Sequence, residues 1–440
     1  MGMAGTSVTK YETKPLDCWQ KCKELRLDHY KDMATARDRG KLLTSGAVDT
    51  GLIPTGIKDC RFMASEPYGA SIAFDSHFAQ LCEEAVEARG FARDFCGYMR
   101  NYMGSMYVDR FLFGGPFPRP DFCLTIHICD AHAKWYQIVG EYYDIPFFGI
   151  DLPMGHPDDG RGDERVEYAA SNAWDAIEWL EKVTGQKYDD ELLFQAIDYE
   201  VEAMALWSEI CILNQAIPAP LDQKSMWSLY VPAALMKGRR EVTEYYRALR
   251  DEVQYRVDHG IAALATERFR LLFDGQPPWF FLQSFRVMEE YGAACVGSHY
   301  AFCLVGQFDV DDEGMWHASK PLKERDITLR SREDAVRFYA SEELNKPFYA
   351  SVYALPWKRF RDYLGLVKGW NAGGMVIHLN RGCEGLAQYQ LETKLALDKA
   401  GVPNLTYEGN MADKREFDGA QVLDRLEAFM ENLGLKRLST

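Results

Sequence analysis

The sequence lacks the short motifs that identify several common enzyme classes. It contains no G-x-G-x-x-G loop, no Walker phosphate loop, no C-x2-C pair and no H-E-x-x-H helix. These absences argue in turn against a Rossmann dehydrogenase, a P-loop ATPase, a zinc ribbon and a zinc protease. If the protein depends on energy from ATP, we therefore expect another subunit to supply it.

Basic charge and long apolar runs are also scarce. The chain carries 50 Lys and Arg against 66 Asp and Glu, for a formal net charge of −16. Because phosphate binding needs concentrated Lys and Arg, we expect neither nucleic acid nor a membrane surface as a partner. No stretch approaches the roughly 18 uninterrupted apolar residues of a membrane span, and the start of the sequence has no apolar signal segment. These features predict a soluble, cytoplasmic protein.

The chain does contain cysteine, with 11 residues of this type. Cytoplasmic thiols are kept reduced, so we expect metal chemistry rather than a disulfide framework. Cys383 follows the apolar run 375–379 and precedes a helix-like stretch, and Cys129 repeats this arrangement after the run 122–128. Ligands of open α/β sheets bind at such strand ends, and a helix N-terminus favours the thiolate that ligates metal. Taken alone, such a cysteine is more readily explained as a small buried residue, but the repeated context favours ligation.

Cys96 has a different context. It lies in the predicted helix 91–106, four residues before Arg100, so both side chains would share one helical face. A cation beside a thiol lowers its proton affinity, although packing among neighbouring aromatic residues explains this cysteine equally well. Cys18 and Cys22 also share a helical face, but without a second pair we expect them to belong to the core.

The order of predicted elements indicates an α/β fold. Strands are expected at 122–128, 146–151, 279–283, 293–298 and 375–379, and almost all of 166–259 has helical character. We predict two Rossmann- or flavodoxin-like parallel-sheet domains with a helical insertion and an N-terminal helical segment. The expected boundaries are 1–58 for the N-terminal helical segment, 59–165 for the first α/β domain with Cys96 and Cys129, 166–262 for the helical insertion, and 263–440 for the second α/β domain with Cys383.

Several of these stretches together resemble a known family. They are Cys96-Gly97-Tyr98-Met99-Arg100, then Cys129-Asp130, and above all HLNRGCEGL running into YEGNMADKREFD. They are similar to the 2-hydroxyacyl-CoA dehydratase and benzoyl-CoA reductase superfamily. The sequences of residues 378–384 and 408–417 look most like those of a cluster-carrying subunit of an ATP-dependent, class I benzoyl-CoA reductase. The resemblance extends from about residue 59 to the C-terminus and is most specific in roughly the last 70 residues.

The resemblance implies a [4Fe-4S] cluster between two α/β domains, held by Cys96, Cys129 and Cys383. It also implies a homologous second cluster-binding subunit, separate ATP-hydrolysing subunits that supply electrons, and an acyl-CoA substrate. The expected activity is oxygen-sensitive, anaerobic reduction of the aromatic ring of benzoyl-CoA to a cyclic dienoyl-CoA, which is an oxidoreductase reaction. The alternatives are a 2-hydroxyacyl-CoA dehydratase subunit, which would remove water through radical chemistry, and a partner that only relays electrons or supports the active subunit.

Some assignments stay open at this point. Other thiols could replace a ligand or add to a larger, double-cubane cluster; they are Cys60, Cys82, Cys123, Cys295 and Cys303. Arg100 and Arg381 are candidates for steadying the cluster charge or the substrate oxygen. No general acid is evident, because His127, His132 and His378 near the strand ends each have an ordinary structural explanation.

Overall fold

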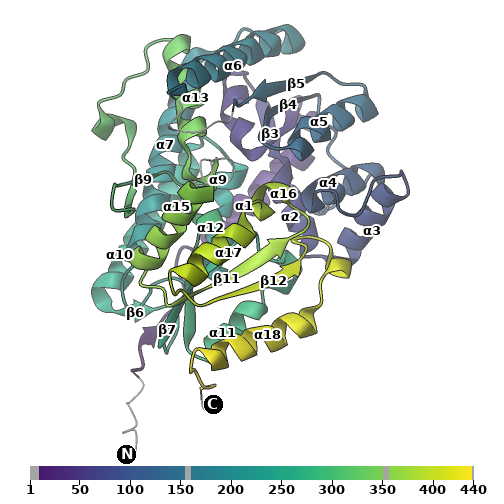
Figure 1. Ribbon diagram of the computed structural model, residues 1–440. Helices are drawn as coiled ribbons and strands as arrows, with labels where there is room; N and C mark the ends of the chain where they lie inside the picture. The colour runs from purple at the N-terminus through teal and green to yellow at the C-terminus, as the bar shows by residue number, and fades with distance from the viewer. Residues whose placement is uncertain (1–8, 154–159, 350–355, 439–440) are drawn as a thin grey trace, which may run out of the picture.

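Two four-stranded parallel sheets form the centre of the protein (Figure 1). The computed structural model describes residues 9–153, 160–349 and 356–438. The sheet orders are β3-β2-β4-β5 and β12-β11-β7-β8. Numbered by chain order, both sheets are 2-1-3-4, the start of the flavodoxin-like doubly wound order. The predicted α/β fold with two parallel sheets is confirmed. The strands are β2 (Leu42–Gly46), β3 (Cys60–Ala64), β4 (Phe122–His127), β5 (Phe147–Asp151), β7 (Phe269–Asp274), β8 (Ala293–Ser298), β11 (Gly374–Asn380) and β12 (Asn404–Gly409).

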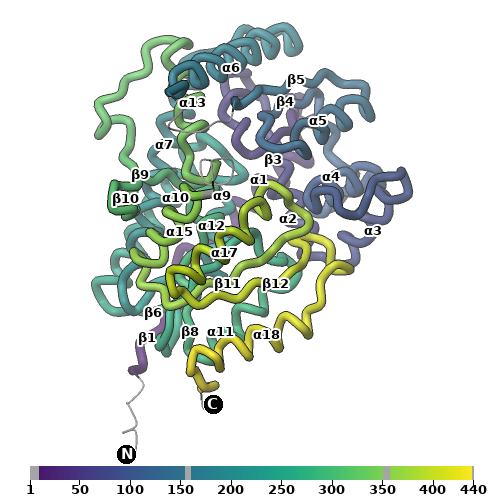
Figure 2. Tube along the Cα trace, viewed as in Figure 1, coloured from purple at the N-terminus to yellow at the C-terminus, as the bar shows by residue number. Residues whose placement is uncertain are grey.

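Helices cover both sheets and connect them, as the trace in Figure 2 shows. Among the described residues, two short strand pairs lie outside these sheets: β1 (Glu12–Thr13) with β6 (Ile261–Ala262), and β9 (Phe308–Val310) with β10 (Trp316–Ala318). The helices are α1 (Trp19–Ala34), α2 (Ser65–Ala73), α3 (Ser76–Glu87), α4 (Gly97–Tyr107), α5 (Asp130–Tyr143), α6 (Gly162–Thr184), α7 (Asp190–Leu213), α8 (Gln223–Leu229), α9 (Val231–Leu235), α10 (Arg240–His259), α11 (Ser284–Glu290), α12 (His299–Cys303), α13 (Arg332–Asn345), α15 (Pro356–Gly369), α16 (Glu384–Ala387), α17 (Gln390–Lys399) and α18 (Gly419–Asn432). The short 3₁₀ helices are η1 (Arg37–Arg39), η2 (Val48–Gly56), η3 (Trp279–Phe281), η4 (Leu322–Arg325) and η5 (Lys414–Glu416).

The helical stretch between the sheets corresponds to the insertion expected at 166–262, since α6 to α10 occupy 162–259. The N-terminal 58 residues contain α1, but they are not only helical. Residues 42–46 form β2, which pairs with both β3 and β4 and is therefore a central strand of the first sheet. Its sequence LLTSG gives no alternating apolar pattern, because a strand buried on both faces does not need one. The domain boundaries themselves stay a prediction.

The prediction of a strand at 279–283 is wrong, and the first strand of the second sheet is β7 instead. That stretch forms the 3₁₀ helix η3 directly after Pro277 and Pro278, whose rings fix φ and remove two backbone donors. β7 was missed because Arg270 interrupts its apolar run. The Arg270 guanidinium is buried and donates to the backbone carbonyls of Asn214, Gln215 and Ala216.

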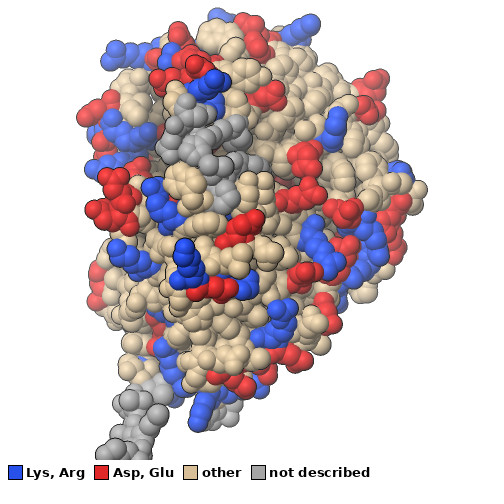
Figure 3. Space-filling model, in the orientation of Figure 1, with Lys and Arg blue, Asp and Glu red and all other residues tan. Residues whose placement is uncertain are grey.

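Acidic and basic side chains are interspersed on the face of the protein seen in Figure 3. Within the described parts of the chain, no helix combines the length and the apolar character that crossing a membrane requires.

Candidate functional site

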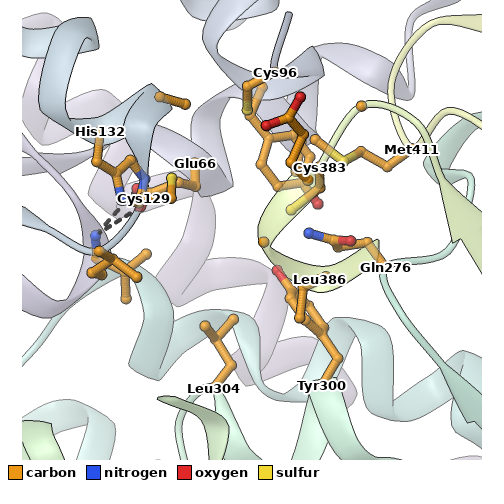
Figure 4. Close-up of a pocket in the computed structure, with 18 of the residues that line it drawn as sticks. Glu66, Cys96, Cys129, His132, Gln276, Tyr300, Leu304, Cys383, Leu386 and Met411 are labelled. Atoms are coloured by element: carbon orange, nitrogen blue, oxygen red, sulfur yellow. Dashed lines mark hydrogen bonds and ion pairs between the residues drawn. The ribbon is translucent and has the colours of Figure 1, made fainter. Parts of the chain in front are cut away.

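A cavity of about 270 Å³ lies at the carboxyl ends of both sheets (Figure 4). Open α/β sheets bind ligands at this edge, where the strand order reverses. The lining includes one residue from the segment after each of seven strands: Asp49 after β2, Glu66 after β3, Cys129 after β4, Gln276 after β7, Tyr300 after β8, Cys383 after β11 and Met411 after β12. The two similar sheets therefore build one site between them.

All three cysteines singled out from the sequence line this cavity. Each is the residue immediately before a helix: Cys96 before α4, Cys129 before α5 and Cys383 before α16. Figure 4 shows Cys96 and Cys383 close together, with Cys129 on the opposite wall. The expected helix over 91–106 begins only at Gly97, so Cys96 precedes the helix and does not share a helical face with Arg100.

Burial and mutual repulsion set the proton affinities of these thiols. Burial, and next the proximity of Cys383, raises the pKa of Cys96 well above its usual range. Burial also raises the pKa of Cys383, while the side chain of Gln276 acts in the opposite direction. Burial acts likewise on Cys129, but the neighbouring His132 outweighs it and lowers the pKa of that thiol. Three thiolates in this space repel one another, so positive charge bound among them would be stabilising.

Two glycines allow the chain segments that carry Cys96 and Cys383 to lie against each other. The Gly97 N–H donates to the Gly382 carbonyl at 3.2 Å, which joins the two chain segments directly. A Cβ on Gly97 would lie 2.9 Å from Oδ1 of Asn410, and a Cβ on Gly382 only 2.7 Å from the same atom. That oxygen is fixed because it accepts the backbone N–H groups of Ala412 and Asp413. Both glycine positions must therefore stay without a side chain.

Arg100 lies away from the cavity and joins the two halves of the site. Its Nη2 contacts Asp413 at 2.9 Å and Glu87 at 2.8 Å, and the side chains of Arg100 and Asp413 are fully buried. Arg415 also contacts Asp413, at 2.7 Å. Arg381 is 60% exposed and pairs with Glu408. Neither predicted arginine lines the cavity, so the structure does not bring Arg100 or Arg381 to the three cysteines.

A partly buried ion pair on the Cys129 wall was not expected from the sequence. His132 Nε2 lies 2.8 Å from Glu66 Oε1, and Glu66 also accepts the Val48 N–H. Burial opposes protonation of His132, but Cys129 and Glu66 raise its pKa well above the usual range. The helical spacing from Cys129 to His132 was visible in the sequence. Glu66 could not be found because its partner lies far along the chain, beyond helices α3 and α4 and strand β4.

The remaining candidates do not reach the cavity. Cys82, Cys123, Cys295 and Cys303 are core residues, and Cys60 is partly buried elsewhere. His378 is buried beside Tyr407, and burial lowers its pKa to about 4. His127 pairs with Asp151. None of these side chains supplies a further ligand to the described cavity.

The residues present fit an iron–sulfur cluster better than a single ion. In the described part of the chain, no three Cys, His, Asp or Glu side chains lie close enough to hold one metal ion. Three thiols spread over opposite walls of one cavity suit the larger span of a polynuclear cluster, which is held by cysteine thiolates. The three thiols are partly buried and their thiolate forms would repel one another, which adds a second reason for that fit.

Comparisons with known proteins agree with this geometry. The model of the family described as 2-hydroxyglutaryl-CoA dehydratase, D-component, matches residues 69–433. The (R)-phenyllactyl-CoA dehydratase alpha subunit of Clostridium sporogenes is 26% identical over 376 residues, covering 84% of each chain. The (R)-2-hydroxyisocaproyl-CoA dehydratase alpha subunit of Clostridioides difficile is 24% identical over 422 residues, covering 93% of this chain and 94% of the relative.

A benzoyl-CoA reductase subunit of Thauera aromatica is 25% identical over 369 residues, covering 80% of this chain and 79% of the relative. It matches less strongly than the two dehydratase subunits. The expected superfamily is confirmed, whereas the expected preference for the reductase is not, because the dehydratase alternative fits these relatives better. Since the family match spans most of its length, this chain belongs to the 2-hydroxyglutaryl-CoA dehydratase D-component family.

Proposed function

We propose that this chain is the cluster-carrying subunit of a 2-hydroxyacyl-CoA dehydratase, a lyase. The observation that carries the proposal is the convergence of Cys96, Cys129 and Cys383 on one cavity at the carboxyl ends of two parallel sheets. The relatives support dehydration ahead of ring reduction. We also propose a homologous partner subunit, since both the alpha and the beta subunit of one dehydratase are similar to this chain. A separate ATP-hydrolysing electron donor is proposed because the sequence has no phosphate-binding loop.

The three thiolates would hold a [4Fe-4S] cluster and leave one iron without a protein thiolate. When bound, such a cluster supplies single electrons and a Lewis-acidic iron for an acyl oxygen. The chain's own residues would bind and shield the acyl-CoA. Tyr98, Tyr300 and Leu304 line the cavity and exclude water from an apolar or aromatic acyl group.

Polar groups around the same cavity would orient the ligand. Gln276 lies beside Cys383 and can donate to an acyl oxygen, while the His132–Glu66 pair keeps a partly buried cation on the Cys129 wall. This cation would stabilise negative charge on the bound acyl group.

Ring reduction is the second candidate function, favoured by the reductase relative and by the aromatic cavity wall. Anaerobic assays with (R)-2-hydroxyisocaproyl-CoA, (R)-phenyllactyl-CoA and benzoyl-CoA separate the two functions. Dehydration should need only catalytic amounts of ATP and reductant, whereas ring reduction should consume both stoichiometrically. Stoichiometric consumption with benzoyl-CoA and no dehydration would reject the first proposal in favour of the second.

The ligand assignment is tested by iron and sulfide analysis with EPR of anaerobically purified protein. Cys383→Ser should lose cluster iron and signal, because the cysteine lines the cavity. Cys60→Ser is the matched control, since Cys60 is also partly buried but lies outside the cavity. Equal iron content in both variants would refute the assignment of Cys383.

A further inference from the structure

A buried charged network adjoins the cavity and is not used by the cluster ligands. Its members are Asp49 in η2, Glu343 in α13, and Lys346 and Tyr349 just after α13. Their exposed fractions are 3%, 4%, 1% and 1%, respectively. Asp49 and Tyr349 line the cavity together with the three cysteines, whereas Glu343 and Lys346 lie behind them.

Continuous hydrogen bonds join the cavity wall to Glu343. The Tyr349 hydroxyl donates to Oδ2 of Asp49. Lys346 Nζ donates to Oδ1 of Asp49 at 2.7 Å, and to the two carboxylate oxygens of Glu343 at 2.6 and 2.7 Å. A proton can therefore pass between Glu343 and the cavity through Lys346, Asp49 and Tyr349 without crossing an open gap.

The network has two carboxyl groups for one ammonium group. Burial raises the pKa of Glu343 to about 7, with Lys346 opposing burial and Asp49 adding to it. Burial also acts to raise the pKa of Asp49, but Lys346 outweighs it and lowers that pKa. Near neutral pH, a proton taken up by the network therefore resides on Glu343 rather than on Asp49. The pKa of Glu343 thus lies close to neutral pH, where a proton-transferring group is most effective.

Other charged groups face these carboxyls from each neighbouring element. Lys237 lies near both and is itself paired with Glu200 of α7 at 2.6 Å. The Tyr339 hydroxyl of α13 donates to the Asp49 carbonyl oxygen at 3.0 Å. The Lys237–Glu200 pair is balanced in charge, so it leaves the imbalance of the neighbouring network in place.

A second buried network shows what a balanced arrangement looks like. Tyr363 donates to Asp274, and Arg359 Nη2 contacts the same carboxylate at 3.1 Å. It has the same Asp, Tyr and cation components, but its charges are one to one and it does not line the cavity. A buried ion pair costs desolvation and is often no more stable than apolar packing, so an unbalanced one beside a reaction cavity favours a functional explanation.

We propose that Tyr349 is the proton-donating residue of the cavity, and that Asp49, Lys346 and Glu343 position it and restore its proton. The proposal rests on the dehydratase function. In that reaction the C2–O and C3–H bonds break and a C2=C3 bond forms. Tyr349 gives its proton to the departing hydroxide, which becomes water, and recovers one from Glu343 through Lys346 and Asp49. The proton released from C3 returns to the network, so its charge is the same before and after turnover.

The test uses cluster-loaded protein with its partner subunit and compares Tyr349→Phe with Tyr363→Phe. Tyr349→Phe should lower kcat by about 100-fold with unchanged KM and iron content, because general acid catalysis is worth about 10² or more. Tyr363→Phe removes the same hydroxyl from the balanced network and should stay within about twofold of wild type. Glu343→Gln should remove the inflection near pH 7 from the pH profile of kcat. Equal kcat in the two phenylalanine variants, or an inflection that survives in Glu343→Gln, would overturn the proposal.

A spectroscopic measurement keeps this test separate from the dehydratase function. Infrared titration of the same loaded protein should show a buried carboxylic acid that deprotonates near pH 7. Its signal should vanish in Glu343→Gln and remain in Tyr363→Phe. If no substrate is dehydrated but this signal is found, the dehydratase proposal fails while the proton-holding network stands. If dehydration occurs but no such carboxyl titrates, the network proposal fails alone.

Discussion

Breaking the Arg100–Asp413 contact should loosen the connection between the two halves of the site. Arg100 lies in α4, the helix that begins directly after Cys96. Asp413 follows β12 of the second sheet. Their charged groups are 2.9 Å apart and fully buried. Arg100→Met would leave the Asp413 carboxylate with Arg415 as its remaining cationic contact. Removing one partner from a buried pair typically costs about 3 to 5 kcal/mol, and the remaining arginine argues for the lower end, about 3 kcal/mol.

The pKa of Asp413 gives an independent magnitude. Burial acts to raise it, but hydrogen bonds from Arg415 and then Arg100 outweigh burial and lower it from 3.8 to about 2. This difference corresponds to about 2.5 kcal/mol in favour of the charged form. Arg415 contributes the larger part, so we assign about 1 kcal/mol to the Arg100–Asp413 pair. Because the folded pKa is depressed, this stability is fully present above about pH 4 and is lost as the pH falls through about 2.

A double-mutant cycle separates these quantities. Urea unfolding at pH 7 would compare wild type, Arg100→Met, Asp413→Asn and the double variant, with iron retention measured in parallel. We expect about 3 kcal/mol for Arg100→Met, a coupling energy of about 1 kcal/mol, and faster iron loss in both single variants. A coupling energy below about 0.3 kcal/mol would refute the argument, because it would mean that the contact does not connect the halves energetically.

Two further substitutions test how the site is assembled. Gly382→Ala should lower the free energy of unfolding by about 1–3 kcal/mol and reduce cluster content, because its Cβ would lie 2.7 Å from the fixed Asn410 oxygen. Gly162→Ala is the control and should retain the cluster, because the space around Gly162 is open. Equal cluster content in the two variants would contradict this. Arg381→Gln should change the free energy of unfolding by less than about 1 kcal/mol and leave turnover within about twofold, since its pair with Glu408 is exposed. A large loss of turnover would instead support the sequence-based hypothesis that Arg381 acts on the cluster or substrate.

The sequence predicted the parts of the site that are local in the chain. Cys129 and Cys383 each follow a strand and precede a helix, and this context alone places a thiol at the ligand-binding edge of a parallel sheet. Cys96 was found, but its local structure was wrong. The stretch before Gly97 lacks strong helix breakers, yet α4 begins only at Gly97, whose N–H donates to the Gly382 carbonyl in the second half of the chain.

The contacts that the sequence did not reveal join residues far apart along the chain. Arg100 looked like a neighbour of Cys96, but its buried partner Asp413 is 313 residues away. Asp49 and Tyr349 are 300 residues apart and gave no joint signal. In each case the pairing depends on how the two sheets face each other, which periodicity and spacing do not encode.

The arrangement of the cavity follows from using one fold twice. Each sheet presents its carboxyl ends to the same space, so each can supply ligands on short, rigidly placed segments at the starts of helices. The thiols come from the segments that begin α4, α5 and α16, whereas the proposed proton donor comes from the segment after α13 and its Asp49 partner from η2. Electron and proton chemistry would thus be supplied to one ligand by different elements. Substituting Tyr349 can therefore alter proton transfer without removing a cluster ligand, and this separation is what makes the two proposals distinguishable by experiment.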